Sequence, residues 1–159
     1  MLVQVEVASF AVDPARNAPL VVLRETGGIR SVAIPIGPLE ASAIAIHSLQ
    51  VEPDKPLTID LVKIMIDELG ATLRRVVIYD VIEQSFHARL QVQTGSAVKV
   101  VDCRPCDGVG LALRFDSPIF IDETVFNKLQ SGSNLSESEQ LRKNIRTLDT
   151  TEFGRFVLE

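Results

Sequence analysis

The feature that most constrains the fold of this sequence is a set of short segments that are rich in β-forming residues or alternate apolar with polar residues, and that occur in neighbouring pairs. In residues 86–92, apolar side chains alternate with His87, Arg89 and Gln91, which is the period of a strand with one buried face. This run follows a β-rich stretch, Val76–Ile82, after a break of three residues. The two runs therefore predict a hairpin in a sheet that leaves one face in contact with water.

The first half of the chain has the same organisation. Residues 3–7 alternate valine with polar side chains, and the β-rich runs Leu20–Leu23 and Ile29–Ile36 flank Gly27 and Gly28. Paired glycines supply the positive φ that a tight hairpin needs. We therefore expect one strand followed by a second hairpin.

The stretch between Thr58 and Gly70 predicts an amphipathic helix. Thr58 follows a turn-rich segment and is interpreted as the N-cap, and Gly70 ends the pattern. Leu61, Met65 and Leu69 recur at intervals of four and share one side of the helix. This segment therefore carries an apolar helical face.

Other segments complete the order of elements. Similar periodicities predict helices at 38–50, 105–115 and 123–130, and strands at 97–101 and 118–121. Together with the hairpins, this order predicts an α+β fold. Its core is a mostly antiparallel mixed β-sheet built from hairpins and flanked by helices.

The composition is that of one globular unit with an appendage. At 159 residues, with 46% hydrophobic and 23% charged side chains, the chain is long enough for one domain with a core and too short for two ordinary ones. We assign residues 1–130 to this domain and residues 131–159 to a linker and a C-terminal helical tail. Ser136 and Glu139 form a capping box, and we expect the charged helix that it begins to run to about Leu148.

Membrane insertion and secretion are not indicated. Apolar runs such as Val76–Tyr79 fall far short of the roughly 20 residues that a membrane-spanning helix needs. The N-terminus carries Glu6 and strand-like alternation in place of a basic leader. We therefore expect a cytoplasmic protein that does not associate with membranes. The net charge of −5 disfavours non-specific binding of nucleic acid, so a nuclease would need a local basic patch or a metal.

Four carboxylates are candidates for phosphodiester chemistry: Glu40, Asp60, Asp102 and Asp107. Carboxylate oxygens can hold Mg²⁺ or Mn²⁺, which activates water and stabilises the leaving oxygen. For such an ion we assign Asp102, Asp107 and Glu40 as ligands. Arg104 can bind a phosphate in a bidentate manner. Because Asp102, Arg104 and Asp107 emerge at one predicted strand-to-helix junction, this junction is the best candidate site.

Each of these residues also has a structural interpretation. Glu40 and Asp60 lie in predicted first helical turns, where the helix dipole favours an acid whatever the function. Asp102 or Asp107 can cap the following helix. Arg104 can pair with either of them.

Cys103 and Cys106 are the two cysteines of the chain. A disulfide framework and an all-cysteine zinc site are therefore both excluded within one chain. The CxxC spacing at a strand-to-helix junction is that of a thiol–disulfide exchange site, where a helix N-terminus stabilises a thiolate. The order of elements is not that of a thioredoxin-like fold, so redox sensing is the weakest of the functional alternatives.

The helix at 105–115 also bears on assembly. Gly108 and Gly110 allow another backbone to approach closely. The apolar residues of this helix and of the tail exceed what one small core can bury, so we expect a homo-oligomer.

Three groups of motifs occur in an order that is similar to a known family. They are Ile34-Pro35-Ile36-Gly37 with Glu40-Ala41 and Ala43-Ile44; Pro56-Leu57-Thr58 with Asp60-Leu61; and Asp102, Arg104-Pro105 and Asp107 with Leu111-Ala112-Leu113-Arg114 and Ser117-Pro118-Ile119. In this order and spacing, residues 1–130 resemble the bifunctional nuclease domain family, whose members are described as cleaving both DNA and RNA. No single motif is specific, but their joint order makes a chance match improbable.

The resemblance implies a nuclease that acts on DNA and RNA, with single-stranded nucleic acid as the expected partner. Two positions depart from the family pattern, which usually has histidine where this chain has Ile59 and serine where it has Cys106. An activity that depends on that histidine would be impaired. The alternative is a non-enzymatic binding or regulatory module, in which Arg104 and the adjacent helix N-terminus hold a phosphate-bearing ligand or a protein partner.

Overall fold

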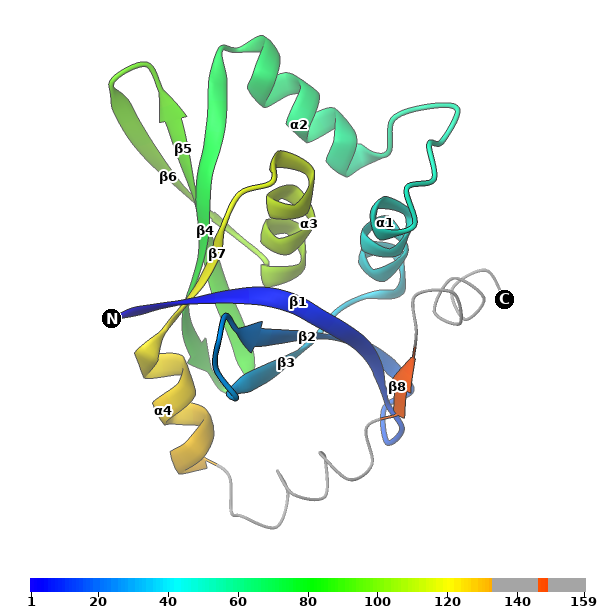
Figure 1. The fold of residues 1–159 in the computed structure, drawn as a ribbon, viewed down its shortest axis with the longest axis vertical. Coiled ribbons are helices and arrows are strands. Elements are labelled where there is room, and N and C mark those ends of the chain that lie inside the picture. The colour runs from blue at the N-terminus through cyan, green and yellow to red at the C-terminus, as the bar shows by residue number, and fades with distance from the viewer. Residues whose placement is uncertain (133–145, 149–159) are drawn as a thin grey trace.

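A computed structural model of the chain describes residues 1–132 and 146–148 (Figure 1). Its strands form one sheet in the order β3-β2-β1-β7-β4-β5-β6, with β8 added to β1. All neighbours in this sheet are antiparallel except β4 and β7, which are parallel. The predicted α+β class and the mostly antiparallel mixed sheet are therefore confirmed. The elements are β1 Leu2–Asp13, β2 Ala18–Glu25, β3 Ser31–Pro35, α1 Pro38–Ser48, α2 Thr58–Glu68, β4 Ala71–Ile82, β5 Ser85–Thr94, β6 Ala97–Cys103, α3 Pro105–Phe115, β7 Ile119–Asp122, α4 Glu123–Gly132 and β8 Arg146–Leu148.

Both predicted hairpins are present. Glu83 and Gln84 connect β4 to β5, and both have positive φ, 48° and 65°, which matches the twist of a tight hairpin. The turn between β2 and β3 places Gly27 at φ 73°. Ile29 belongs to this turn and is 96% exposed, so the third strand begins two residues later than expected.

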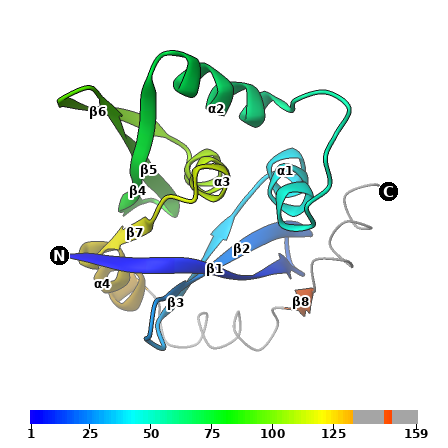
Figure 2. The ribbon, with the colours of Figure 1, turned by 45° about the horizontal axis from the view of Figure 1, so that its top comes forward.

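The sheet bends so that β1, β2 and β3 run across β4, β5 and β6, and three helices fill the inside of the bend (Figures 1 and 2). The most enclosed of these is α3, in which seven residues are buried. It lies so close to the sheet that a Cβ on Gly108 would stand 2.8 Å from Val76 Cγ1. This glycine therefore allows α3 to approach β4.

The burial of α3 and α2 differs from the sequence expectation. Most of the apolar residues of α3 are buried within one chain, so this helix offers little apolar surface for self-association. By contrast, α2 has no buried residue, and Leu61, Met65 and Leu69 are 50%, 56% and 80% exposed. The N-cap of α2 is Leu57, and Thr58 is the first helical residue.

The C-terminal tail contributes a strand where the sequence predicted the end of a helix. Arg146–Leu148 pairs with Phe10–Val12 of β1. β7 and β8 join the same edge of β1, opposite to β2. Because β7 pairs only with Leu2–Val5, the backbone groups further along this edge are free to bind β8. The start of the predicted tail helix, at Ser136 and Glu139, lies outside the described residues.

Candidate functional site

Arg104 joins two of the predicted site residues. Its Nη1 lies 2.9 Å from Glu40 Oε1, and its Nε and Nη2 donate to the two carboxylate oxygens of Asp107 at 2.8 and 3.0 Å. The Arg104 side chain is 64% exposed, compared with 23% for Glu40 and 39% for Asp107. The hydrogen bond to Asp107 raises the pKa of Arg104, so the guanidinium stays charged.

The beginnings of two helices position this cluster, which we call the Arg104 cluster and define as Glu40, Arg104 and Asp107. Arg104 is the N-cap of α3, and Asp107 lies in the first turn of that helix. Glu40 lies in the first turn of α1, beside its N-cap, Gly37. The positive ends of two helix dipoles therefore meet where the two carboxylates lie. Neither N-cap has a side-chain capping hydrogen bond, so Asp107 binds Arg104 and does not cap α3.

Asp60 lies apart from this cluster and has a different partner. Its carboxylate accepts from Arg114 Nε at 2.5 Å and from the Leu57 backbone N–H at 3.0 Å. Arg114 is only 4% exposed and also donates to the carbonyl oxygens of Gly110 and Ala43. The pair therefore ties α1, α2 and α3 together. Burial raises the pKa of Asp60, but the hydrogen bonds from Arg114 and Leu57 outweigh it and bring the pKa below its usual value.

Asp102 also lies outside the Arg104 cluster. It is exposed, and its register partner on β5 is Arg89. The neighbours of Arg89 along β5, Ala88 and Leu90, are buried under α3, so Asp102 projects from the opposite face of the sheet. The strand-to-helix junction thus brings Arg104 and Asp107 together and sends Asp102 to the other side.

This arrangement does not fit the divalent metal that the carboxylates suggested. Glu40 and Asp107 share Arg104, and Asp102 is on the other face. Among the described residues, no three His, Cys, Asp or Glu side chains lie close enough to hold an ion. We therefore derive no step through a metal.

The surroundings of the two cysteines disfavour the thiolate form, whereas a reactive thiol needs surroundings that favour it. Burial, and then the charge of Asp107, raises the pKa of Cys103 to about 12, and burial also raises the pKa of Cys106. A thiolate is therefore scarce at neutral pH, although Cys106 lies in the first turn of α3.

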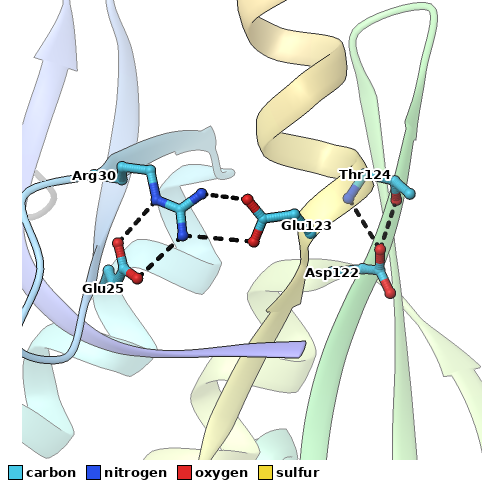
Figure 3. A network of polar contacts seen from close by, with 5 residues as sticks. All are labelled: Glu25, Arg30, Asp122, Glu123 and Thr124. Carbon is cyan, nitrogen blue, oxygen red and sulfur yellow. Dashed lines mark hydrogen bonds and ion pairs between the residues drawn. The ribbon is translucent and has the colours of Figure 1, made fainter. Parts of the chain in front are cut away.

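Sequence reasoning missed a second arginine between two carboxylates. Arg30 binds Glu25 through Nε at 2.9 Å and Glu123 through Nη1 at 2.5 Å (Figure 3). Its guanidinium also lies over the Phe126 ring, 4.4 Å from the centroid. The Arg30 side chain is about half as exposed as that of Arg104. Its ion pairs link the turn between β2 and β3 to the start of α4. An arginine between two acids is thus also a structural device in this fold, and the exposure of Arg104 is what distinguishes it.

Comparison with known proteins gives the family. A family model described as the bifunctional nuclease domain matches residues 21–133. The chain belongs to the bifunctional nuclease domain family. It is also 35% identical over 156 residues to two proteins of Mycobacterium tuberculosis, "Uncharacterized protein MT1877" of strain CDC 1551 / Oshkosh and "Uncharacterized protein Rv1829" of strain ATCC 25618 / H37Rv. Each match covers 97% of this chain and 92% of the relative.

Within this bifunctional nuclease domain, the departure at Ile59 has a local explanation. The Cδ1 atom of Ile59 occupies the space that a Cβ on Gly110 would need, and Ile59 packs against the core. The pair Ile59 and Gly110 is therefore complementary in size across the contact between α2 and α3. At this position the domain has an apolar packing contact in place of a titratable imidazole.

Proposed function

We propose that this bifunctional nuclease domain hydrolyses phosphodiester bonds of DNA or RNA at the Arg104 cluster. The observation that carries the proposal is the exposed Arg104 guanidinium, held by Glu40 and Asp107 where the N-termini of α1 and α3 meet. Family membership supports the choice of nucleic acid as substrate. Guanidinium groups and helix N-termini are both suited to bind phosphate.

The three side chains have separate roles in this reaction. Arg104 binds a non-bridging phosphate oxygen, and Asp107 keeps the guanidinium oriented through two hydrogen bonds. When the phosphate replaces Glu40 as a partner of Arg104, the Glu40 carboxylate is free to accept a proton from water. The water oxygen then forms the new bond to phosphorus, the ester P–O bond breaks, and the proton passes from Glu40 to the leaving oxygen.

A non-enzymatic phosphate-binding module is the second candidate. It is favoured by the arrangement of the acids, because no group of them among the described residues gathers where it could hold a metal for hydrolysis. In this case Arg104 holds the ligand and no proton transfer follows. Redox sensing by Cys103 and Cys106 is disfavoured by their raised pKa values.

The test is a cleavage assay on single-stranded DNA and RNA with Mg²⁺, with Mn²⁺ and with a chelator, using wild type, Arg104→Gln and Glu40→Gln. Arg30→Gln is a matched control, because it also removes an arginine from between two carboxylates. We expect Arg104→Gln to lower the cleavage rate by about a hundredfold and Arg30→Gln to lower thermal stability with little change in the rate of the folded protein. Binding without cleavage by wild type would select the non-enzymatic module.

We also propose a cytoplasmic location and a homo-oligomeric state. None of the helices that the structure describes is long and apolar enough to cross a membrane. We infer a cytoplasmic location from the sequence, and we infer a homo-oligomer from the exposed apolar side chains of α2. The division into a domain at 1–130 and a tail at 131–159 likewise stays a prediction.

A further inference from the structure

The sheet has a second polar surface, on the face of β4 and β5 that is opposite to α3. Along β5, Ala88, Leu90 and Val92 are buried, and Arg89 and Gln91 alternate with them on the other side. The register places Arg89 opposite Val77 and Gln91 opposite Arg75. We call this surface the outer face and define it as Arg75, Tyr79, Arg89, Gln91 and Phe120.

Each arginine of the outer face lies over an aromatic ring. The guanidinium of Arg89 is 5.0 Å from the centroid of Tyr79, and that of Arg75 is 5.7 Å from the centroid of Phe120. Arg75 Nε also donates to Gln91 Oε1 at 2.7 Å. Both arginines are half-buried, and a guanidinium that stacks on one ring can stack a base on its other face.

Neither arginine is neutralised by a carboxylate. Arg75 and Arg89 form no ion pair with another residue that the structure describes, in contrast to Arg30, Arg104 and Arg114. The Nε of Arg89 is moreover buried without a hydrogen-bond partner. An unsatisfied donor on a charged group is costly, and an anion bound at the rest of this half-buried guanidinium would offset that cost.

Two more cationic side chains lie on β4 and β6. Arg74, at the bulge of β4, has no ion-pair partner among residues 1–132. Lys99 on β6 has none either, but its register partner is the buried Val92, so it projects on the face that α3 covers. The acids near Arg89 are Asp102, its register partner on β6, and Asp122 at the end of β7, which binds Thr124. The chain as a whole is acidic, with a net charge of −5, so the unneutralised arginines on β4 and β5 are a local feature.

We infer that the outer face binds single-stranded nucleic acid, with Arg75 and Arg89 contacting phosphates and the stacked guanidinium and aromatic groups contacting bases. The inference rests on the proposed function for the class of ligand. Flat stacking groups combined with cations match unstacked bases and their phosphates. An acidic peptide would use the cations and leave the stacked groups without a role.

The outer face is connected to the Arg104 cluster by the edge of the sheet. Arg89 is paired with Asp102, and Asp102 is two residues before Arg104 on the chain. A strand of nucleic acid that lies on β4 and β5 and passes around the end of β6 would therefore arrive at Arg104. The outer face supplies binding, and the Arg104 cluster acts on the bound chain.

The test measures binding of a fluorescent single-stranded 15-nucleotide DNA and RNA by anisotropy over a range of salt concentrations. The proteins are the full-length wild type, Arg75→Gln, Arg89→Gln, the double variant, and Arg24→Gln as control. Arg24 is an exposed arginine on β2, in the other half of the sheet. We expect the double variant to bind at least about tenfold more weakly, and its slope of log affinity against log salt to fall by about 1.4, since each phosphate contact on a single strand contributes about 0.7.

Arg75→Gln keeps the test valid if removal of Arg89 impairs folding, which a melting curve detects. The inference would be overturned if the folded Arg75→Gln and double variants bound as tightly as wild type. It would also be overturned if Arg24→Gln lost as much affinity as they do, or if wild type did not bind. Hydrolysis of bis(4-nitrophenyl) phosphate, which is too small to span both surfaces, is measured in parallel. Its loss in Arg104→Gln with normal activity in the double variant supports the proposed function by itself, whatever the outcome for the outer face.

Discussion

Ile59 and Gly110 are packed so that the isoleucine Cδ1 fills the position of the missing glycine Cβ. The contact joins α2 to α3, and it lies at a position where the family usually carries a histidine. Because α2 has no fully buried residue, each partly buried contact of this helix contributes a large share of what holds it in place.

This contact predicts a coupled pair of substitutions. Gly110→Ala alone should destabilise the protein by about 1 kcal/mol, because the isoleucine must move. In an Ile59→Ala background the same change should stabilise the protein by about 0.5–1 kcal/mol, because alanine is the better helix former. Urea unfolding of the four proteins measures the coupling, and additive effects would show that the two side chains do not compete for space.

Asp60→Asn should destabilise the protein at pH 7 by about 3–5 kcal/mol, since it leaves the buried Arg114 guanidinium without a counter-ion. The folded pKa of Asp60 lies below its usual value of about 3.9. Its contribution is therefore complete above about pH 4 and is lost as the pH falls through the folded pKa. The free energy of unfolding, measured by chemical unfolding between pH 2 and 7, should decrease less toward acid for Asp60→Asn than for wild type. Parallel pH profiles for the two proteins would contradict this role.

Gly37→Ala should reduce cleavage more than stability. An alanine Cβ at this position would collide with the Glu40 carboxylate, which is the mobile end of a long side chain. The carboxylate would move away from Arg104, while replacing glycine by alanine at an N-cap costs less than about 1 kcal/mol. Cleavage rates and melting curves on the same samples check this, and a normal rate would show that the position of Glu40 is unimportant.

Both cysteines should react slowly with thiol reagents. With a pKa of about 12 for Cys103, the thiolate fraction at pH 8 is roughly a thousandth of that of an ordinary cysteine. We expect no insulin-reduction activity from the native protein. Rapid modification at pH 7 by Ellman's reagent, or a reductase activity lost in Cys103→Ser/Cys106→Ser, would restore the redox hypothesis.

Local patterns predicted most of the fold because the strands lie in hairpins and their side chains alternate between a buried face and a solvent-exposed face of the sheet. The helix at 105–115 was predicted with its final bounds because Pro105 fixes its start. The exposure of α2 could not be predicted, since periodicity identifies an apolar face without saying what covers it. The pairing of β8 with β1 depends on a strand edge more than 130 residues away in sequence and has no local signal.

The candidate site was predicted in part. Glu40 and Asp107 converge because α1 and α3 begin side by side, which no spacing along the chain reveals. Asp102 is separated from Asp107 by the alternation of β6, so proximity in sequence was misleading there. Asp60 shares the acidic first-turn position of Glu40 but faces Arg114, and only the three-dimensional structure distinguishes the two.

The most direct measurement of the central claim is the rate of single-stranded DNA and RNA cleavage by Asp107→Asn, with a melting curve on the same protein. The substitution keeps the shape of the side chain and removes the charge that binds Arg104. We predict a cleavage rate at least about tenfold below that of wild type, with a melting temperature within a few degrees because the pair is exposed. An unchanged rate in a folded Asp107→Asn protein, under conditions where wild type cleaves, would contradict the assignment of the site to the Arg104 cluster.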